Sequence, residues 1–310
     1  MLETSQTVPR SWLAFELNIL RRLEFSSISM PFFENPQLGR ALKSLNVKVV
    51  ANDLLKSVFV ESTAAIENND YRLSEEEIEI VLEDVYVPQY RLNNPALTNW
   101  FSESDAWWFD NVRQNIIKLE TPMSRAIALS IGIEVGNYAL SFDDQTRELR
   151  QPLSNVFKRL WNIRREPTNN GQNNACHNKD ANEFIAENYT DLLFLKLPRA
   201  RKRSLRESLG WTAWREEWIR KSDQFWDDLE YSQRGKLGTR IETKSQYLSL
   251  IVEVFKTAQH IDLWAIEHVE DGFIQSQDVV EAISEVRRVD TIYSKDFSEL
   301  MGTKAVIITA

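Results

Sequence analysis

The sequence has little cysteine and histidine, and this scarcity excludes two kinds of site. The single cysteine, Cys176, allows no internal disulfide and fits a reducing compartment. The histidines are His177, His260 and His268, and only His177 is adjacent to the cysteine. Because a structural zinc site needs four Cys or His ligands in a spaced pattern, we predict that the chain holds no metal.

Long apolar runs and an excess of basic residues are also missing. No stretch of about 18 uncharged apolar residues occurs, and the N-terminal residues carry acids and lack a signal-peptide core. We therefore expect a soluble, cytoplasmic protein with no membrane partner. Lys and Arg number 37 against 46 Asp and Glu, which gives a net charge of −9. Since phosphate binding needs a positive face, any contact with DNA must come from a local basic patch.

What the sequence does contain is an alternation of strand and helix patterns. Short apolar and β-branched runs typical of buried strands occur at residues 46–52, 191–197, 263–268 and 303–309. Helical patterns separate these runs. Helices between strands predict an α/β fold with a doubly wound, mostly parallel sheet.

The middle of the chain has a different, helical pattern. Residues 74–82 (SEEEIEIVL) begin like a capped acidic helix, and residues 124–140 form a long helix with an apolar face. A polar Asn- and Gly-rich stretch then leads back to the strand pattern. We predict an α/β domain made of residues 1–74 and 170–310, interrupted by a helical insertion at residues 75–169.

Three segments carry a family pattern. Residues 31–55 (PFFENPQLGRALKSLNVKVVANDLL) contain Asp53 after a strand, residues 178–184 (NKDANEF) contain Asp180, and residues 191–199 (DLLFLKLPR) form a strand and its end. In this order they resemble the F-x-G-x-G, G-D-x-x-x-F and D-P-P-Y segments of Dam-type adenine-specific DNA methyltransferases. The resemblance implies a Rossmann-like S-adenosylmethionine methyltransferase fold with a target-recognition-like insertion. It also implies that Phe33, Asp53 and Asp180 bind S-adenosylmethionine.

The D-P-P-Y positions are the family's catalytic ones, and here they read Lys196, Leu197, Pro198 and Arg199. In the family, the acid holds the amino group of the target adenine and the aromatic ring stacks on the flipped base. A lysine ammonium only donates hydrogen bonds, so it cannot accept one from that amino group. Adenine methylation by the family's mechanism is therefore not expected.

The cofactor segment departs from the family as well. F-x-G-x-G reads Phe33, Glu34, Asn35, Pro36 and Gln37, without the glycines that let the backbone approach the cofactor. The other candidate residues also have plain structural interpretations. Phe33 is typical of a core, an aspartate after a strand often caps a turn, and an aspartate before a helix often caps that helix. Binding of S-adenosylmethionine is possible but doubtful on these residues.

A basic segment follows the third family segment. Residues 196–206 (KLPRARKRSLR) hold six basic residues and no acid, just after the end of a strand. This segment could contact DNA phosphates, or it could be a solvated loop. The candidate DNA-binding residues are Arg199, Arg201, Lys202, Arg203 and Arg206.

A second anomaly follows at Trp211, Trp214 and Trp218, which share one face of a predicted helix. Such a stripe is typical of a core. If it is exposed, it would instead be an interaction surface, because tryptophan is enriched at binding hot spots.

Three functions remain open at this point. The first, which we favour, is a degenerate methyltransferase homologue that acts as a DNA- or protein-binding module. The second is an active S-adenosylmethionine-dependent enzyme of altered specificity, which requires Asp53 and Asp180 to face one cavity. The third is an inactive subunit that pairs with an active methyltransferase or with itself through the tryptophan helix.

Overall fold

A computed structural model describes residues 10–84, 91–143, 145–270 and 272–310. The chain forms two compact units. An α/β unit comprises Met1–Leu54, Asn170–Gly210 and Trp226–Ala310, and a helical unit comprises Leu55–Asn169 and Trp211–Phe225. The chain thus leaves the α/β unit twice, whereas the sequence predicted one insertion.

The helical unit also begins earlier than the predicted residue 75. It starts at Leu55 because helix α3 (Lys56–Ser62) packs on α6 (Pro122–Leu140) and on α10 (Ala213–Arg220). The tryptophan helix α10 belongs to this unit as well, although the prediction had placed it in the α/β domain. Side-chain packing across α3, α6 and α10 decides these boundaries, and a local sequence pattern does not report it.

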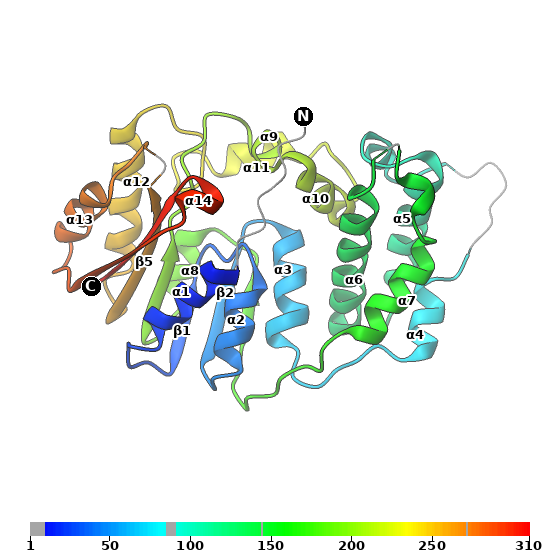
Figure 1. Cartoon of the computed structure of the whole chain (residues 1–310), viewed down its shortest axis with the longest axis horizontal. Helices are drawn as coiled ribbons and strands as arrows, with labels where there is room; N and C mark the ends of the chain where they lie inside the picture. Colours follow the sequence, from blue (N-terminus) through cyan, green and yellow to red (C-terminus); the bar gives the residue numbers. More distant parts are fainter. Residues whose placement is uncertain (1–9, 85–90, 144, 271) are drawn as a thin grey trace. The chain divides into compact units, whose positions relative to one another are not determined.

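The α/β unit contains one seven-stranded mixed sheet (Figure 1). Its strands are β1 (Ser27–Met30), β2 (Lys48–Asn52), β3 (Ala175–His177), β4 (Leu192–Lys196), β5 (Leu263–Glu270), β6 (Thr291–Asp296) and β7 (Lys304–Thr309). Their order is β3-β2-β1-β4-β5-β7-β6, and only β7 runs antiparallel to its neighbours β5 and β6. The predicted α/β class with a mostly parallel sheet is therefore confirmed.

The four predicted strands correspond to β2, β4, β5 and β7. β1, β3 and β6 were not predicted, because β1 and β3 have only four and three residues and β6 is exposed along most of its length. The central strands are apolar on both sides: Leu192, Leu193, Phe194 and Leu195 of β4 are completely buried. Such continuous apolar strands are typical of a sheet that is covered on both faces.

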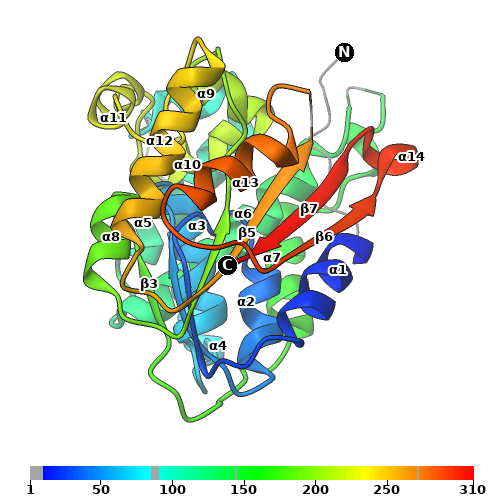
Figure 2. The same ribbon diagram turned by 90° about the vertical axis from the view of Figure 1, so that its left-hand side faces the viewer.

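Helices cover the two faces of this sheet (Figure 2). On one face lie α8 (Ala181–Glu187), α12 (Lys244–Thr257) and α13 (Ser276–Ser284), and on the other lie α1 (Arg10–Leu20) and α2 (Pro36–Lys43). The shorter α9 (Leu205–Leu209), α11 (Trp226–Ser232) and α14 (Ser298–Met301) complete the unit.

The strand order reverses between β1 and β4, which are neighbours although they are distant in sequence. In open α/β sheets, ligands bind beyond the carboxyl ends of the strands at such a reversal. The loops after β1, β2, β3 and β4 all start at the carboxyl edge of the sheet, since these four strands are parallel. The segments that resemble the methyltransferase motifs contain these loops.

The helical unit also contains α4 (Glu75–Val81), α5 (Glu103–Ile116) and α7 (Leu153–Ile163), with the short helices η1 (Thr63–Glu67), η2 (Pro95–Asn99) and η3 (Arg147–Leu149). A one-turn helix, η4 (Gly210–Thr212), precedes α10. The predicted cap of α4 is confirmed, because Ser74 and Glu77 form a reciprocal capping box. Within the part of the chain that the structure describes, no helix is long and apolar enough to span a membrane.

Two tryptophans form the centre of the helical unit. The side chains of Trp214 and Trp218 are completely buried. Each indole packs on a glycine of α6: a Cβ atom built at Gly136 would lie 2.1 Å from Cη2 of Trp214, and one at Gly132 would lie 2.2 Å from Cη2 of Trp218. The core interpretation of the tryptophan stripe is thus confirmed for these two residues.

Candidate functional site

Asn52 ties together the loops at the carboxyl edge of the sheet. It is the last residue of β2 and is buried. Its side-chain amide donates to the carbonyls of Pro31 and Lys179, each at 3.1 Å, and its side-chain oxygen accepts from the amide of Lys179 at 3.1 Å. One buried side chain therefore fixes the chain after β1 and after β3.

Asp53 stabilises the loop after β1. Its Oδ2 accepts a hydrogen bond from the backbone amide of Glu34 at 3.2 Å. Glu34 has φ of +51°, in the left-handed region that a non-glycine residue rarely adopts. The preceding Phe33 is almost completely buried, and its amide donates to the carbonyl of Asn52 at 3.1 Å. The structure thus places Phe33 in the core and directs the Asp53 carboxylate to the protein backbone.

Asp180 is the N-cap of α8. Its Oδ1 accepts from the amides of Asn182 and Glu183 at 3.0 and 3.1 Å. Its Oδ2 forms an ion pair with Nζ of Lys236 at 3.2 Å. Both carboxylate oxygens therefore bind groups of the protein itself, as the capping interpretation predicts.

Lys196 ends β4 inside a buried ionic cluster. Its Nζ lies 2.5 Å from Oε1 of Glu16 on α1. Glu267 lies beside Lys196 in the register of β4 and β5, and its Oε1 accepts from the indole nitrogen of Trp12 at 2.9 Å. Both glutamates are almost completely buried. We call Trp12, Glu16, Lys196 and Glu267 the ionic cluster.

The charges in the ionic cluster depend on one another. Burial disfavours the ammonium of Lys196, but the carboxylates of Glu267 and Glu16 outweigh this effect and hold its pKa above the usual value. Burial raises the pKa of Glu267 to about 8, although the charge of Lys196 opposes the rise. At neutral pH Lys196 is therefore an ammonium, and burial favours the neutral acid form of Glu267.

The sequence prediction missed Glu16 and Glu267. A signal was present for Glu267, since it interrupts the apolar strand LWAIEH, and an acid inside a buried strand needs a partner. For Glu16 on α1 the sequence contained no comparable sign, because only the fold brings α1 to the end of β4.

The remaining D-P-P-Y positions differ in exposure. Leu197 is buried, and its amide donates to the carbonyl of Glu267 at 2.8 Å. The carbonyl of Pro198 accepts from the hydroxyl of Tyr247 at 2.7 Å. Arg199 is exposed. A small pocket at the ends of β4 and β5 is lined by Leu197, Arg199, Ala200, Tyr247, His268, Val269, Phe273 and Ile274.

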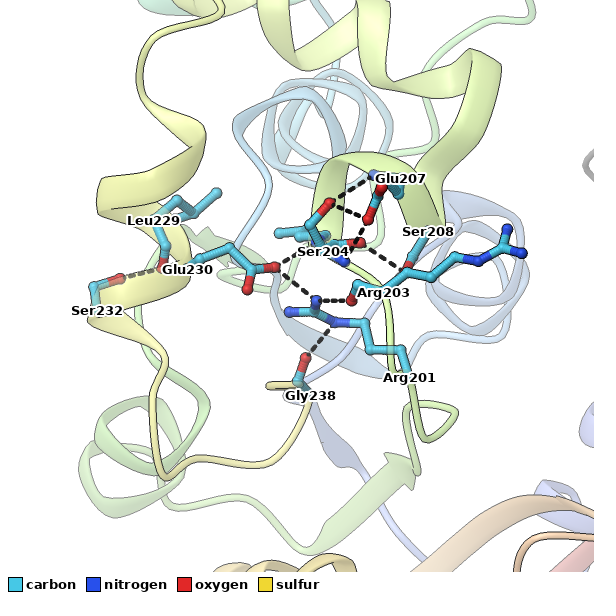
Figure 3. A network of polar contacts seen from close by, with 10 residues as sticks. Arg201, Arg203, Ser204, Glu207, Ser208, Leu229, Glu230, Ser232 and Gly238 are labelled. Carbon is cyan, nitrogen blue, oxygen red and sulfur yellow. Dashed lines mark hydrogen bonds and ion pairs between the residues drawn. The ribbon is translucent and has the colours of Figure 1, made fainter. Parts of the chain in front are cut away.

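Arg201 has a structural role within the basic segment (Figure 3). Its guanidinium donates to the carbonyl of Gly238 at 3.0 Å, to the carbonyl of Arg203 at 2.9 Å and to Oε1 of Glu230 at 2.6 Å. Only 12% of its side chain is exposed. The predicted DNA-binding role of Arg201 therefore conflicts with its geometry, since the group that would bind phosphate holds the loop together.

Lys202 and Arg203 are exposed, and in Figure 3 the side chain of Arg203 extends away from the network of Arg201. A bridge between the backbones of residues 201 and 240 brings the exposed Arg240 to the same surface. Hydrogen bonds from Ser204, and then the charges of Arg203 and Arg240, hold the pKa of Glu207 below its usual value. We call Lys202, Arg203 and Arg240 the basic surface.

Arg240 was not among the predicted residues, because its contact with the basic segment is made across the fold. Arg206, which was predicted, lies half-buried in α9. Within the described ranges, no group of three or more His, Cys, Asp or Glu side chains is placed to hold a metal ion.

Comparison with known proteins adds no family to this description. No protein-family model matches the chain, and no curated protein matches it significantly.

Proposed function

We propose that this protein is a degenerate homologue of adenine-specific DNA methyltransferases that binds DNA without methylating it. The observation that carries the proposal is the state of Lys196, which occupies the position of the family's catalytic acid. It is a cation, only 16% of its side chain is exposed, and it is paired with Glu16 at 2.5 Å. The order of the motif-like loops along the carboxyl edge of a mostly parallel sheet supports the resemblance.

Methyl transfer to adenine needs an acceptor for the protons of the amino group, and the side chains of residues 196–199 offer none. Lys196 only donates, and the carbonyl of Pro198 accepts one hydrogen bond from Tyr247 at 2.7 Å. Arg199 could stack on a base, but it replaces only the ring of the missing tyrosine. The chemistry that the family performs therefore has no counterpart in these residues.

The residues at the cofactor segment do not fit S-adenosylmethionine either. The loop Phe33–Gln37 has no glycine, and Asn35 caps α2 by accepting from the amide of Gln37 at 2.8 Å. Asp53 accepts from Glu34, and Asp180 caps α8. An active enzyme of altered specificity would need both aspartates to face one cavity, and their hydrogen bonds do not support that alternative.

The basic surface supports the DNA-binding part of the proposal. Lys202, Arg203 and Arg240 are exposed cations on one surface of a protein whose net charge is −9. Such cations bind phosphates and carry little sequence information, so we expect DNA binding that depends on salt more than on sequence. Arg199 is a further exposed cation in the same segment.

The third alternative, a structural subunit that pairs through the tryptophan helix, loses its main argument. Trp214 and Trp218 are completely buried within the helical unit, so their indoles cannot form an interaction surface. No other observation favours that alternative over DNA binding.

The test is binding of the full chain to a labelled DNA duplex, measured by fluorescence anisotropy at several salt concentrations. With three phosphate contacts, the logarithm of the affinity should fall with the logarithm of salt at a slope of about −3. The double variant Lys202→Glu/Arg203→Glu should lower the affinity at least tenfold and flatten the slope. Arg288→Glu changes an exposed cation outside the basic segment and should have little effect.

Methyl transfer is measured on the same preparation with labelled S-adenosylmethionine and unmethylated DNA, beside an active adenine methyltransferase. We expect no incorporation above background. Incorporation that depends on the protein would refute the degenerate assignment. Equal loss of affinity in the Arg288→Glu control would show that general charge, and not the basic surface, attracts DNA.

A further inference from the structure

The ionic cluster is also the polar part of the interface that holds α1 on the sheet. From α1, Trp12 donates to Glu267 and Glu16 pairs with Lys196. Apolar contacts complete the interface: the rings of Trp12 and Phe297 stack at 4.9 Å, and Phe15 meets Phe297 edge-on at 6.2 Å. α1 therefore docks through two buried carboxylates as well as through aromatic rings.

The composition of the cluster requires a bound proton. It contains two carboxyl groups that are almost completely buried and one ammonium whose side chain is 16% exposed. If both carboxyls were ionised, the cluster would bury an uncompensated negative charge, which is costly. Two carboxyl groups that share a site avoid this by keeping one proton between them.

The hydrogen bonds indicate where this proton is. Oε1 of Glu267 accepts from Trp12, while Oε2 is buried and receives a hydrogen bond from no donor among the residues that the structure describes. The carboxyl of Glu16 lies in the same cluster, because it pairs with Lys196, the register neighbour of Glu267, and belongs to the helix whose Trp12 donates to Glu267. A hydrogen bond between two carboxyls needs a proton on one of them, and Oε2 of Glu267 is the oxygen that has no other donor.

We propose that the proton between Glu267 and Glu16 is a latch: it holds α1 on the sheet, and its loss releases α1. The other charged group that faces this place is Glu34, in the loop after β1, whose negative charge acts on Lys196. On the side of β7 the neighbour of Glu267 is Ile307, which is apolar. Loss of the proton therefore leaves two carboxylates facing the single ammonium of Lys196 beneath α1.

The direction of the pH effect follows from the two states of Glu267. In the docked state its pKa is raised to about 8, and in water it returns towards 4.5. Docking is therefore strongest at acid pH and weakens by up to about tenfold per pH unit as the pH rises from 4.5 to 8. Above about pH 8 the docked state is ionised as well, and the weakening levels off.

The first experiment measures hydrogen exchange of the α1 amides from pH 6 to pH 9, corrected for the intrinsic rates, in the natural chain and in Glu267→Gln. We expect the protection of α1 in the natural chain to fall by up to about tenfold per pH unit below pH 8. A glutamine amide can accept from Trp12 and donate to Glu16 without a titrating proton, so protection in the variant should not vary with pH. The amides of α12, on the opposite face of the sheet, serve as the control.

A second measurement on the natural chain does not depend on the variant folding. Infrared spectroscopy detects the C=O stretching band of a protonated carboxyl group, which we expect at pH 6.5 and which should disappear with a midpoint near pH 8. Absence of that band at pH 6.5 would overturn the latch. So would an α1 protection that has the same pH dependence in the natural chain and in Glu267→Gln.

Discussion

The basic segment and the tryptophan helix are the two unusual stretches of this sequence, and they differ in how the fold uses them. On α10, Trp214 and Trp218 are both completely buried and both form part of the core of the helical unit. The basic segment divides: Lys196 and Arg201 are bound inside the α/β unit, while Lys202 and Arg203 are exposed. Residues of one chemical type, seven positions apart or fewer, thus have opposite roles.

The difference follows from what each side chain needs. An indole gains free energy from any close-packed apolar surroundings, and Gly132 and Gly136 of α6 provide the space for two of them. A cation can be buried only where an acid or several carbonyls face it. Glu16 meets Lys196 and Glu230 meets Arg201, whereas the exposed pair remains in water. Residue type therefore predicts whether a side chain is buried better for the tryptophans of α10 than for the cations of the basic segment.

The largest expected effect is on the aromatic side of this comparison. Trp214→Ala removes a completely buried indole and should lower the free energy of unfolding by about 3–5 kcal/mol. Trp211→Ala, at a half-buried position one turn earlier, should cost clearly less. Urea unfolding of both variants measures the difference. Equal losses would mean that burial does not distinguish the two tryptophans.

A smaller effect is expected at the glycine that faces Trp214. Gly136→Ala would place Cβ 2.1 Å from the ring, so the helices must move apart, at a cost of about 1–3 kcal/mol. Combining it with Trp214→Phe shortens the ring that the new methyl group meets. In a double-mutant cycle the pair should therefore cost less than the sum of the two single changes. Additive losses would place the strain elsewhere in α6.

The basic segment should show the smallest stability effect, at an exposed cation, beside a larger one at a bound cation. Arg201→Ala removes the ion-pair partner of Glu230 and the guanidinium donor to the carbonyls of Arg203 and Gly238, and should cost about 1–3 kcal/mol. Lys202→Ala should change stability by no more than about 0.5 kcal/mol, because its side chain is exposed. For DNA affinity we expect the opposite order. Among folded variants, Lys202→Ala should lower DNA affinity more than Arg201→Ala, because Lys202 is free to contact phosphate directly. If Arg201→Ala proved neutral to unfolding, the structural role assigned to its guanidinium would be wrong.

Several features of the fold could be predicted from residues alone. The strands β2, β4, β5 and β7 are marked by apolar β-branched runs, and the alternation of strands with helices indicates the α/β class. Helix caps also depend only on neighbouring residues: Ser74 with Glu77 predicts the start of α4, and Asp180 predicts the start of α8. The short β1 and β3 and the exposed β6 were missed because none of them forms a long apolar run.

The candidate site was predictable only in part, because the sequence around a residue does not show which distant side chains will contact it. The sequence places Asp53 and Lys196 at the ends of predicted strands, and the parallel sheet brings Phe33 and Asp180, which follow β1 and β3, to the same edge. Their hydrogen-bond partners come from elsewhere in the chain, such as Glu16 for Lys196 and Lys236 for Asp180. Whether an acid binds a ligand or caps a helix depends on these partners.

By itself, then, the sequence determined the elements that depend on neighbouring residues: the periodic strands and helices, the caps, and the loss of the acid from the D-P-P-Y positions. Only the tertiary structure decided the boundary at Leu54, the place of α10 in the helical unit and the sorting of the basic segment into bound and exposed cations. The reason is that propensity and capping act over a few residues. Burial and charge pairing are settled by side chains that the fold brings together, as it does with Glu16 and Lys196.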